Sequence, residues 1–135
     1  MGLVETKLAI MPGAGGTQFL PRIINPSIAK ELIFSAKIID GKRAEQIGLV
    51  NHAVEQNENG TAAYVKSLDF AEEIIPNGPL GIKMAKKSIN RGLEVDISTG
   101  LTMEEACYNQ LIPTKDRTEG LQAFKEKRKP IFMGQ

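Results

Sequence analysis

The stretch VETKLAIMPGAGGTQ, residues 4–18, decides which fold this chain can form. It joins a glutamate, an apolar run and a glycine-rich turn. Such turns, where they lead into a helix, collect anions on free backbone N–H groups, so a phosphate site is the first hypothesis. The dinucleotide fingerprint and the P-loop both need a glycine where the chain has Gln18. Alternatively, Pro12 and Gly13 simply turn the chain out of a strand and the next glycines let a helix start close to its neighbours.

Length and composition predict one soluble domain of common size. The 135 residues are 41% hydrophobic and 24% charged, and the net charge of +1 gives no field that would select a polyanion. The single cysteine, Cys107, cannot form an internal disulfide, and no Cys/His spacing suits zinc. His52 lies in the apolar run LVNHAV, which favours a strand residue over a catalyst. No stretch approaches the roughly 18 apolar residues of a membrane helix. We therefore expect neither a metal site nor a membrane segment.

Two short strands are predicted, at residues 3–11 and 49–54, in a sequence whose other patterns are helical. Ser27 is the expected N-cap of a helix over 28–36, and Asp40 caps a helix that stops at Gly48. Asp116 and Glu119 resemble a capping box before the charged run at 125–129. The remaining helical patterns cover 17–24, 64–75, 82–92 and a stretch from Asp96 or Thr99 to Pro113.

The helix over 82–92 has two distinct faces. One face is apolar and carries Ile82, Ala85 and Ile89. The opposite face carries four basic side chains, which we interpret as solvated surface: Lys83, Lys86, Lys87 and Arg91.

Two strands cannot form a sheet that this many helices would cover. The favoured interpretation is therefore the back part of a larger α/β fold that begins in mid-domain at Met1. The alternative is an all-helical domain in which residues 3–11 form an irregular arm.

Three stretches carry a family resemblance: GLVETKLAIMPGAGGTQFLPR (2–22), AKELIFSAKIIDGKRAEQIGLVNHAV (29–54) and TKDRTEGLQAFKEKRKPIFMG (114–134). In this order they resemble the enoyl-CoA hydratase/isomerase family, also called the crotonase family, over nearly the whole chain. The resemblance implies an α/β fold of ββα turns wound into a spiral, followed by a helical region that packs trimers. Residues 1–60 would hold the end of the spiral and residues 61–135 the helical oligomerisation region, so this chain is expected to be mostly α.

The resemblance also assigns chemistry to the opening stretch. Glu5 matches one of two carboxylates that flank the substrate double bond, and the turn at Pro12 and Gly13 matches the one whose Gly13 N–H helps hold the attacking water. Hydration of a 2-enoyl thioester needs a base, an acid and donors for the thioester oxygen. The family's other glutamate and both oxyanion donors match sequence that would precede Met1. We therefore expect the chain by itself to be a weak or inactive catalyst.

Two further residues are expected at the nucleotide end of coenzyme A. Tyr108 aligns with an aromatic position and Lys127 with a basic one, where a cation gains a charge-assisted contact with phosphate. An equally open interpretation makes Lys127 an ordinary solvated lysine. Phe19 stands where many family members carry arginine, which puts one helix-surface contact in doubt.

Three functions follow from this resemblance. The first is a mitochondrial lyase of fatty acid or branched-chain amino acid breakdown, with an acyl-CoA thioester as substrate, no cofactor beyond that coenzyme A and no metal. The second is a non-catalytic module that forms trimers or hexamers or joins longer family members. The third, RNA binding, is disfavoured because aromatic residues make up 5% of the chain and its charge is balanced.

Overall fold

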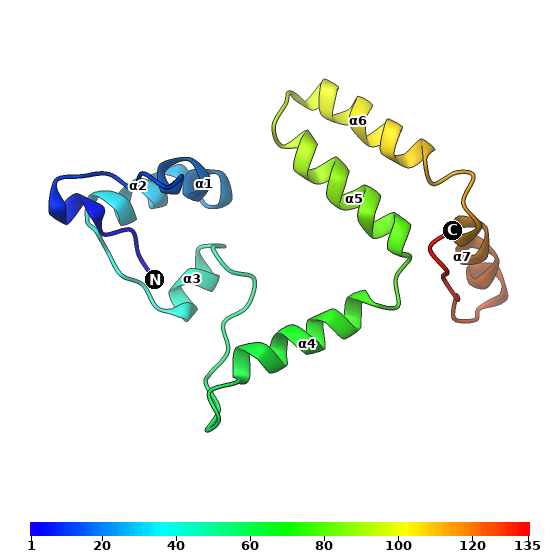
Figure 1. Ribbon diagram of the computed structural model, residues 1–135, viewed down its shortest axis with the longest axis horizontal. Helices are drawn as coiled ribbons and strands as arrows, with labels where there is room; N and C mark the ends of the chain where they lie inside the picture. The colour runs from blue at the N-terminus through cyan, green and yellow to red at the C-terminus, as the bar shows by residue number, and fades with distance from the viewer. The chain divides into compact units, whose positions relative to one another are not determined.

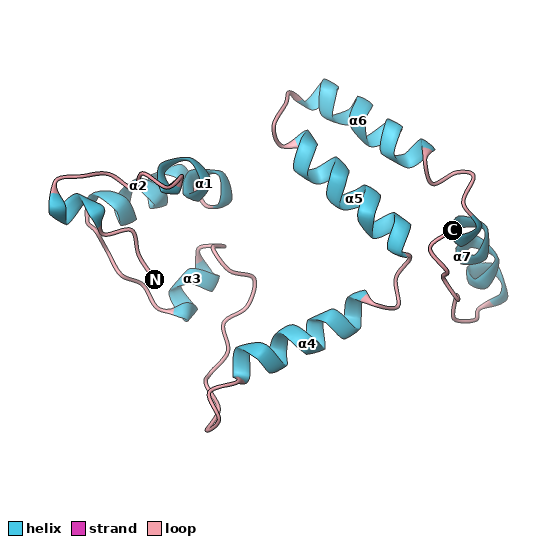
Figure 2. Ribbon diagram, viewed as in Figure 1, coloured by secondary structure: helices cyan, strands magenta, loops and turns pink.

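The computed structural model describes all 135 residues, which form seven α-helices and one short 3₁₀ helix and no strand (Figures 1 and 2). The elements are η1 (Glu5–Leu8), α1 (Gly16–Ile23), α2 (Pro26–Phe34), α3 (Gly41–Gln46), α4 (Ala62–Ile74), α5 (Pro79–Gly92), α6 (Ile97–Asn109) and α7 (Lys115–Glu126). They divide into two compact units, residues 1–67 and 68–135. None of the helices combines the length and apolar character that a membrane span requires.

Both strand predictions are wrong. Glu5–Leu8 forms the 3₁₀ helix η1, and residues 49–54 follow α3 as bends and irregular chain, with His52 exposed. A strand is stabilised by a paired neighbour, and neither segment has one within these 135 residues. Leu49 N instead donates to Ala44 O at 2.8 Å, which closes the end of α3.

A small core holds the first unit together. Ile24, Ala29 and Leu32 are its buried members, and five partly buried side chains pack against them: Leu20, Ile28, Ile39, Ile47 and Leu49. The start of α1 is tightly packed, because a Cβ on Gly16 would lie 2.8 Å from the Pro12 Cβ. The glycines of the opening stretch therefore serve packing at this point, as expected for the non-phosphate interpretation.

Helix ends follow local signals in most places. Asp40 and Asp96 cap α3 and α6 as expected, each accepting hydrogen bonds from backbone N–H groups of the first turn. Gly48 adopts the left-handed φ of +75° just after α3, so the stop predicted there is confirmed. The Ser27 cap is wrong: Asn25 caps α2, and Ser27 N donates to its Oδ1 at 2.8 Å. Proline at the first helical position moves the start of the helix back.

In the second unit, α5 and α6 pack side by side (Figure 1). Gly92 and Gly100 face each other across this pair, since a Cβ on Gly100 would lie 3.6 Å from Gly92 Cα. The apolar face of α5 that carries Ile82, Ala85 and Ile89 is exposed. The half-buried positions are Leu80, Gly81, Met84, Ser88 and Gly92. Small residues let the two backbones approach, and that close approach decides which face is covered.

Candidate functional site

Glu5 is the residue of the first unit with the most unusual polar environment. Its side chain is half-buried at the start of η1, and its Oε2 atom is shielded from solvent with no hydrogen-bond partner. A buried polar atom without a partner costs free energy, and native proteins keep few of them. Glu5 therefore presents a shielded carboxylate oxygen that no group of this chain hydrogen-bonds.

The turn after η1 presents a free donor. Pro12 is fully buried and fixes the start of the turn, whereas Gly13 is exposed and its N–H donates no hydrogen bond within the chain. Packing does not require glycine at position 13, because the nearest atom to an added Cβ would be Met11 O at 3.9 Å. Gly15, by contrast, has the left-handed φ of +88° that favours glycine.

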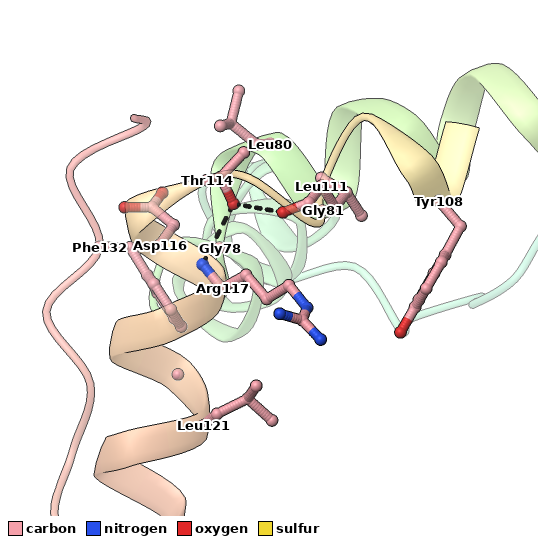
Figure 3. A pocket seen from close by; sticks show the side chains of 11 residues that line it. Gly78, Leu80, Gly81, Tyr108, Leu111, Thr114, Asp116, Arg117, Leu121 and Phe132 are labelled. Atoms are coloured by element: carbon pink, nitrogen blue, oxygen red, sulfur yellow. Dashed lines mark hydrogen bonds between the residues drawn. The ribbon is translucent and has the colours of Figure 1, made fainter. Parts of the chain in front are cut away.

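Tyr108 lies on α6 in the second unit and borders a cavity of about 340 Å³ (Figure 3). The walls are largely apolar and include Leu111, Leu121 and Phe132. At one end, Thr114 Oγ1 donates to Leu111 O at 2.8 Å and accepts from Arg117 N at 3.2 Å, as the dashed lines in Figure 3 show. Tyr108 itself is 57% exposed.

Lys127 ends α7 in a left-handed conformation with φ of +55°. Its N–H donates to Phe124 O at 3.2 Å and Arg128 N donates to Ala123 O at 3.0 Å, the two bonds of a Schellman motif. Its side chain is exposed and does not border the cavity at Tyr108. Glu5, Pro12 and Gly13 belong to the first unit, and Tyr108 and Lys127 to the second.

Sequence reasoning missed the C-terminal strap, residues 128–135, and the two acidic side chains that hold it. Asp116, only 6% exposed, accepts hydrogen bonds from Met133 N and Gly134 N, each at 2.8 Å. Its own N–H donates to Gln135 O at 2.9 Å. The capping-box prediction is wrong, because Thr114 caps α7 and leaves Asp116 for the strap.

Glu119 holds the other end of the strap. It accepts two hydrogen bonds from the Arg128 guanidinium, at 2.6 and 2.9 Å, and one from Ile131 N at 2.9 Å. The Arg128 contact, followed by the Ile131 bond, lowers the pKa of Glu119 to about 2. Glu126 also pairs with Arg128, and the two carboxylates raise the pKa of the guanidinium.

No group of three or more His, Cys, Asp or Glu side chains lies close enough together to hold a metal ion.

The comparison with family models gives one description: the enoyl-CoA hydratase/isomerase model matches residues 1–135. The chain belongs to the enoyl-CoA hydratase/isomerase family. The resemblance seen in its three motif stretches is thereby confirmed.

Named relatives in this family include two mitochondrial proteins. The chain is 63% identical over 135 residues to mitochondrial methylglutaconyl-CoA hydratase of Homo sapiens, a match that covers all of this chain and 40% of that protein. It is 53% identical to mitochondrial enoyl-CoA hydratase domain-containing protein 2 of Mus musculus, over 99% of this chain and 45% of that protein. The stretch 94–117 by itself resembles these same two branches. The chain thus spans less than half the length of these relatives.

A solved structure gives the same family. The crystal structure of enoyl-CoA hydratase from Bacillus anthracis matches with a TM-score of 0.91 and 48% sequence identity, covering 99% of this chain and 50% of that one. The mostly helical fold expected for a C-terminal part of the crotonase fold is confirmed. These comparisons do not test the roles of individual site residues or the division at residue 60.

Proposed function

We propose that this chain supplies the Glu5-bearing part of a 2-enoyl-CoA hydratase site, in which Glu5 delivers or removes the proton at the substrate α-carbon. The observation that carries the proposal is the shielded, unpartnered Oε2 of Glu5. A carboxylate that exchanges a proton with carbon gains nothing from a permanent hydrogen-bond donor on the reacting oxygen. Membership of the hydratase/isomerase family supports the same role.

The chemistry divides into two bond-forming events. Water adds its oxygen to the β-carbon and loses a proton to a base, while the α-carbon receives a proton from an acid. Glu5 serves the α-carbon, and the free N–H of Gly13, in the turn fixed by buried Pro12, donates to the attacking water. A second carboxylate and two oxyanion donors complete the site in family members, and they match sequence outside these residues. Loss of one such donor costs about 10²–10³ in rate.

Coenzyme A enters this proposal as part of the thioester substrate, with no separate cofactor. Lys127 would contact a phosphate of its nucleotide end, and Tyr108 would contact the adenine. The proposed setting is mitochondrial, since the human and mouse relatives are both named as mitochondrial proteins. A relative from Bacillus subtilis at 48% identity shows that the family is also bacterial. Residues 1–60 would then belong to the catalytic spiral and residues 61–135 to the helical region.

The test is crotonyl-CoA hydration, followed by loss of thioester absorbance. The 135-residue chain is assayed alone and mixed with a polypeptide carrying the N-terminal half of a family member. We expect little turnover alone and turnover in the mixture that Glu5→Gln abolishes. The matched control is Glu58→Gln, the same change at an exposed loop glutamate. Turnover in the mixture that survives Glu5→Gln would refute the proposed role of Glu5.

A second candidate, a non-catalytic oligomerisation module, is favoured by exposed apolar side chains. Phe124 is 86% exposed, Leu93 83% and Ile97 78%, all in the second unit. Large uncovered apolar patches favour assembly, into trimers or hexamers or with longer family members. Native mass spectrometry at micromolar concentration is expected to show oligomers. A stable monomer would exclude this module, whatever the outcome of the hydratase assay.

A further inference from the structure

The segment that carries Glu5 has little apolar packing to hold it in place. η1 contains no buried residue, and its largest apolar side chain, Leu8, is 73% exposed. Apolar burial stabilises an element roughly in proportion to the area removed from water. Apolar burial therefore contributes little to holding η1 against α2, and a directional interaction between the two elements adds to their contact.

Thr6 makes that interaction. Its Oγ1 donates a partly buried hydrogen bond to Ile33 O at 2.8 Å, and no other side chain of η1 forms a hydrogen bond. Ile33 is itself buried and belongs to the last turn of α2. Its carbonyl oxygen already accepts from Ala36 N at 3.2 Å, as part of the Schellman motif that ends α2. A carbonyl oxygen has two lone pairs, so the Thr6 hydroxyl occupies the second acceptor position of Ile33 O.

Flanking anchors hold the chain on either side of Glu5, but they form no hydrogen bond with its side chain. Met1 and Ile39 exchange two hydrogen bonds at 2.7 and 2.9 Å, and Pro12 is buried in the following turn. Thr6 is the nearest anchor to Glu5 and adjoins it directly. Because α2 carries three buried residues, Ala29, Leu32 and Ile33, the Thr6 bond ties η1 to the core of the first unit.

We propose that Thr6 is the positioning residue of Glu5: its hydrogen bond to the end of α2 keeps the Glu5 carboxylate in its shielded orientation. The consequence for catalysis rests on the proposed function, but the positioning itself does not. A typical neutral hydrogen bond contributes about 1 kcal/mol net, so its loss should raise the population of the open segment about fivefold.

The test compares Thr6→Val, which removes the hydroxyl at nearly constant shape, with Thr6→Ser, which keeps it. Carboxylate labelling by a water-soluble carbodiimide and an amine, read by mass spectrometry, reports the accessibility of Glu5 relative to exposed Glu58 in the same molecule. We expect Glu5 labelling to rise about fivefold in Thr6→Val and to stay within twofold of wild type in Thr6→Ser. Amide exchange at Ile10, whose N–H donates to Glu5 O at 3.3 Å, should rise in parallel.

Three results would overturn the positioning role. Unchanged Glu5 labelling in Thr6→Val would show that the bond does not control the carboxylate. Equally raised labelling in both variants would show that the hydroxyl does not hold the carboxylate, because Thr6→Ser retains it. Loss of amide protection throughout α2 would show that Thr6 holds the unit as a whole. Because none of these readouts requires turnover, failure of the hydratase proposal is recognised separately, by the Glu5→Gln assay.

Discussion

Replacing Asp116 by asparagine should release the C-terminal strap from α7. The carboxylate accepts from both Met133 N and Gly134 N at 2.8 Å and is nearly fully buried. Asparagine has the same shape but only one acceptor oxygen. Whichever way the amide is turned, its NH₂ group faces one of the two backbone donors. The variant therefore loses one charge-assisted hydrogen bond and weakens the other.

The size of the effect follows from these two bonds. A hydrogen bond to a charged group contributes about 1.5–3 kcal/mol net, and a neutral one about 1 kcal/mol. The released amides reach water easily, since the Met133 side chain is exposed, so no large desolvation penalty is added. We expect the free energy of strap opening to fall by about 2–3 kcal/mol, which raises the equilibrium constant for opening roughly 30- to 150-fold.

Amide hydrogen exchange followed by NMR measures this opening directly. Exchange at Met133 and Gly134 should accelerate by the factor above, while the amides of α5 keep their protection. Asp69→Asn is the matched control, because it makes the same change at an exposed aspartate of α4 that forms no hydrogen bond or ion pair. If Gly134 exchange rises less than twofold in Asp116→Asn, the carboxylate does not hold the strap and the reasoning fails.

Two further predictions concern the same helix. Lys127→Gly should stabilise the chain by about 0.5–1 kcal/mol in urea unfolding, because glycine adopts the left-handed region without strain, whereas Lys127→Ala should give no gain; equal effects of both would refute this. The pKa of Glu119 is lowered from 4.5 to about 2, so its contribution to strap stability is complete above about pH 5 and is lost as the pH falls toward 2. The Ile131 amide shift should follow that transition in an NMR titration, and a transition centred above pH 4 would contradict it.

Helices and their ends were the predictable part of this fold. The helix between Asp40 and Gly48 and the one that begins at Asp96 match the structure because their signals are local. A cap or a left-handed glycine acts within one turn of its own helix, so its effect does not depend on distant partners.

Features that depend on a partner were not predictable in this way. Residues 3–11 have the apolar pattern of a strand but no strand beside them, and Ile10 remains exposed. On α5, apolar periodicity selects Ile82 and Ile89, while the helix packs through Gly92 against Gly100. Hydrophobic periodicity identifies a face of α5 that can be buried. The close approach of the α5 and α6 backbones instead determines which face of α5 is covered.

In the candidate site too, local sequence signals were insufficient where a residue's role depends on distant partners. By residue type alone, Glu5 resembles an ordinary surface glutamate, and only the family resemblance selects it; the structure adds the shielded oxygen. The roles of Asp116 and Glu119 were missed because acids near a helix start usually cap it. A signal was available in the later Arg128, which could pair with one of them, but sequence spacing does not show that the chain turns back along α7.

Lys127 has a strained left-handed backbone conformation and is also the residue proposed to contact coenzyme A. Three helix ends in this chain share the Schellman pattern, with Ala36, Gly48 and Lys127 in left-handed conformations. Glycine is the least strained choice, because a Cβ in the left-handed conformation lies too close to the following carbonyl oxygen. Ala36 is buried in the first unit, so its methyl group contributes packing. Lys127 is exposed and its ammonium contacts nothing in the chain, so no interaction here offsets the strain. If Lys127 contacts a coenzyme A phosphate as proposed, the more stable Lys127→Gly variant should bind coenzyme A more weakly than wild type in a calorimetric titration, and equal affinity would contradict the proposed contact.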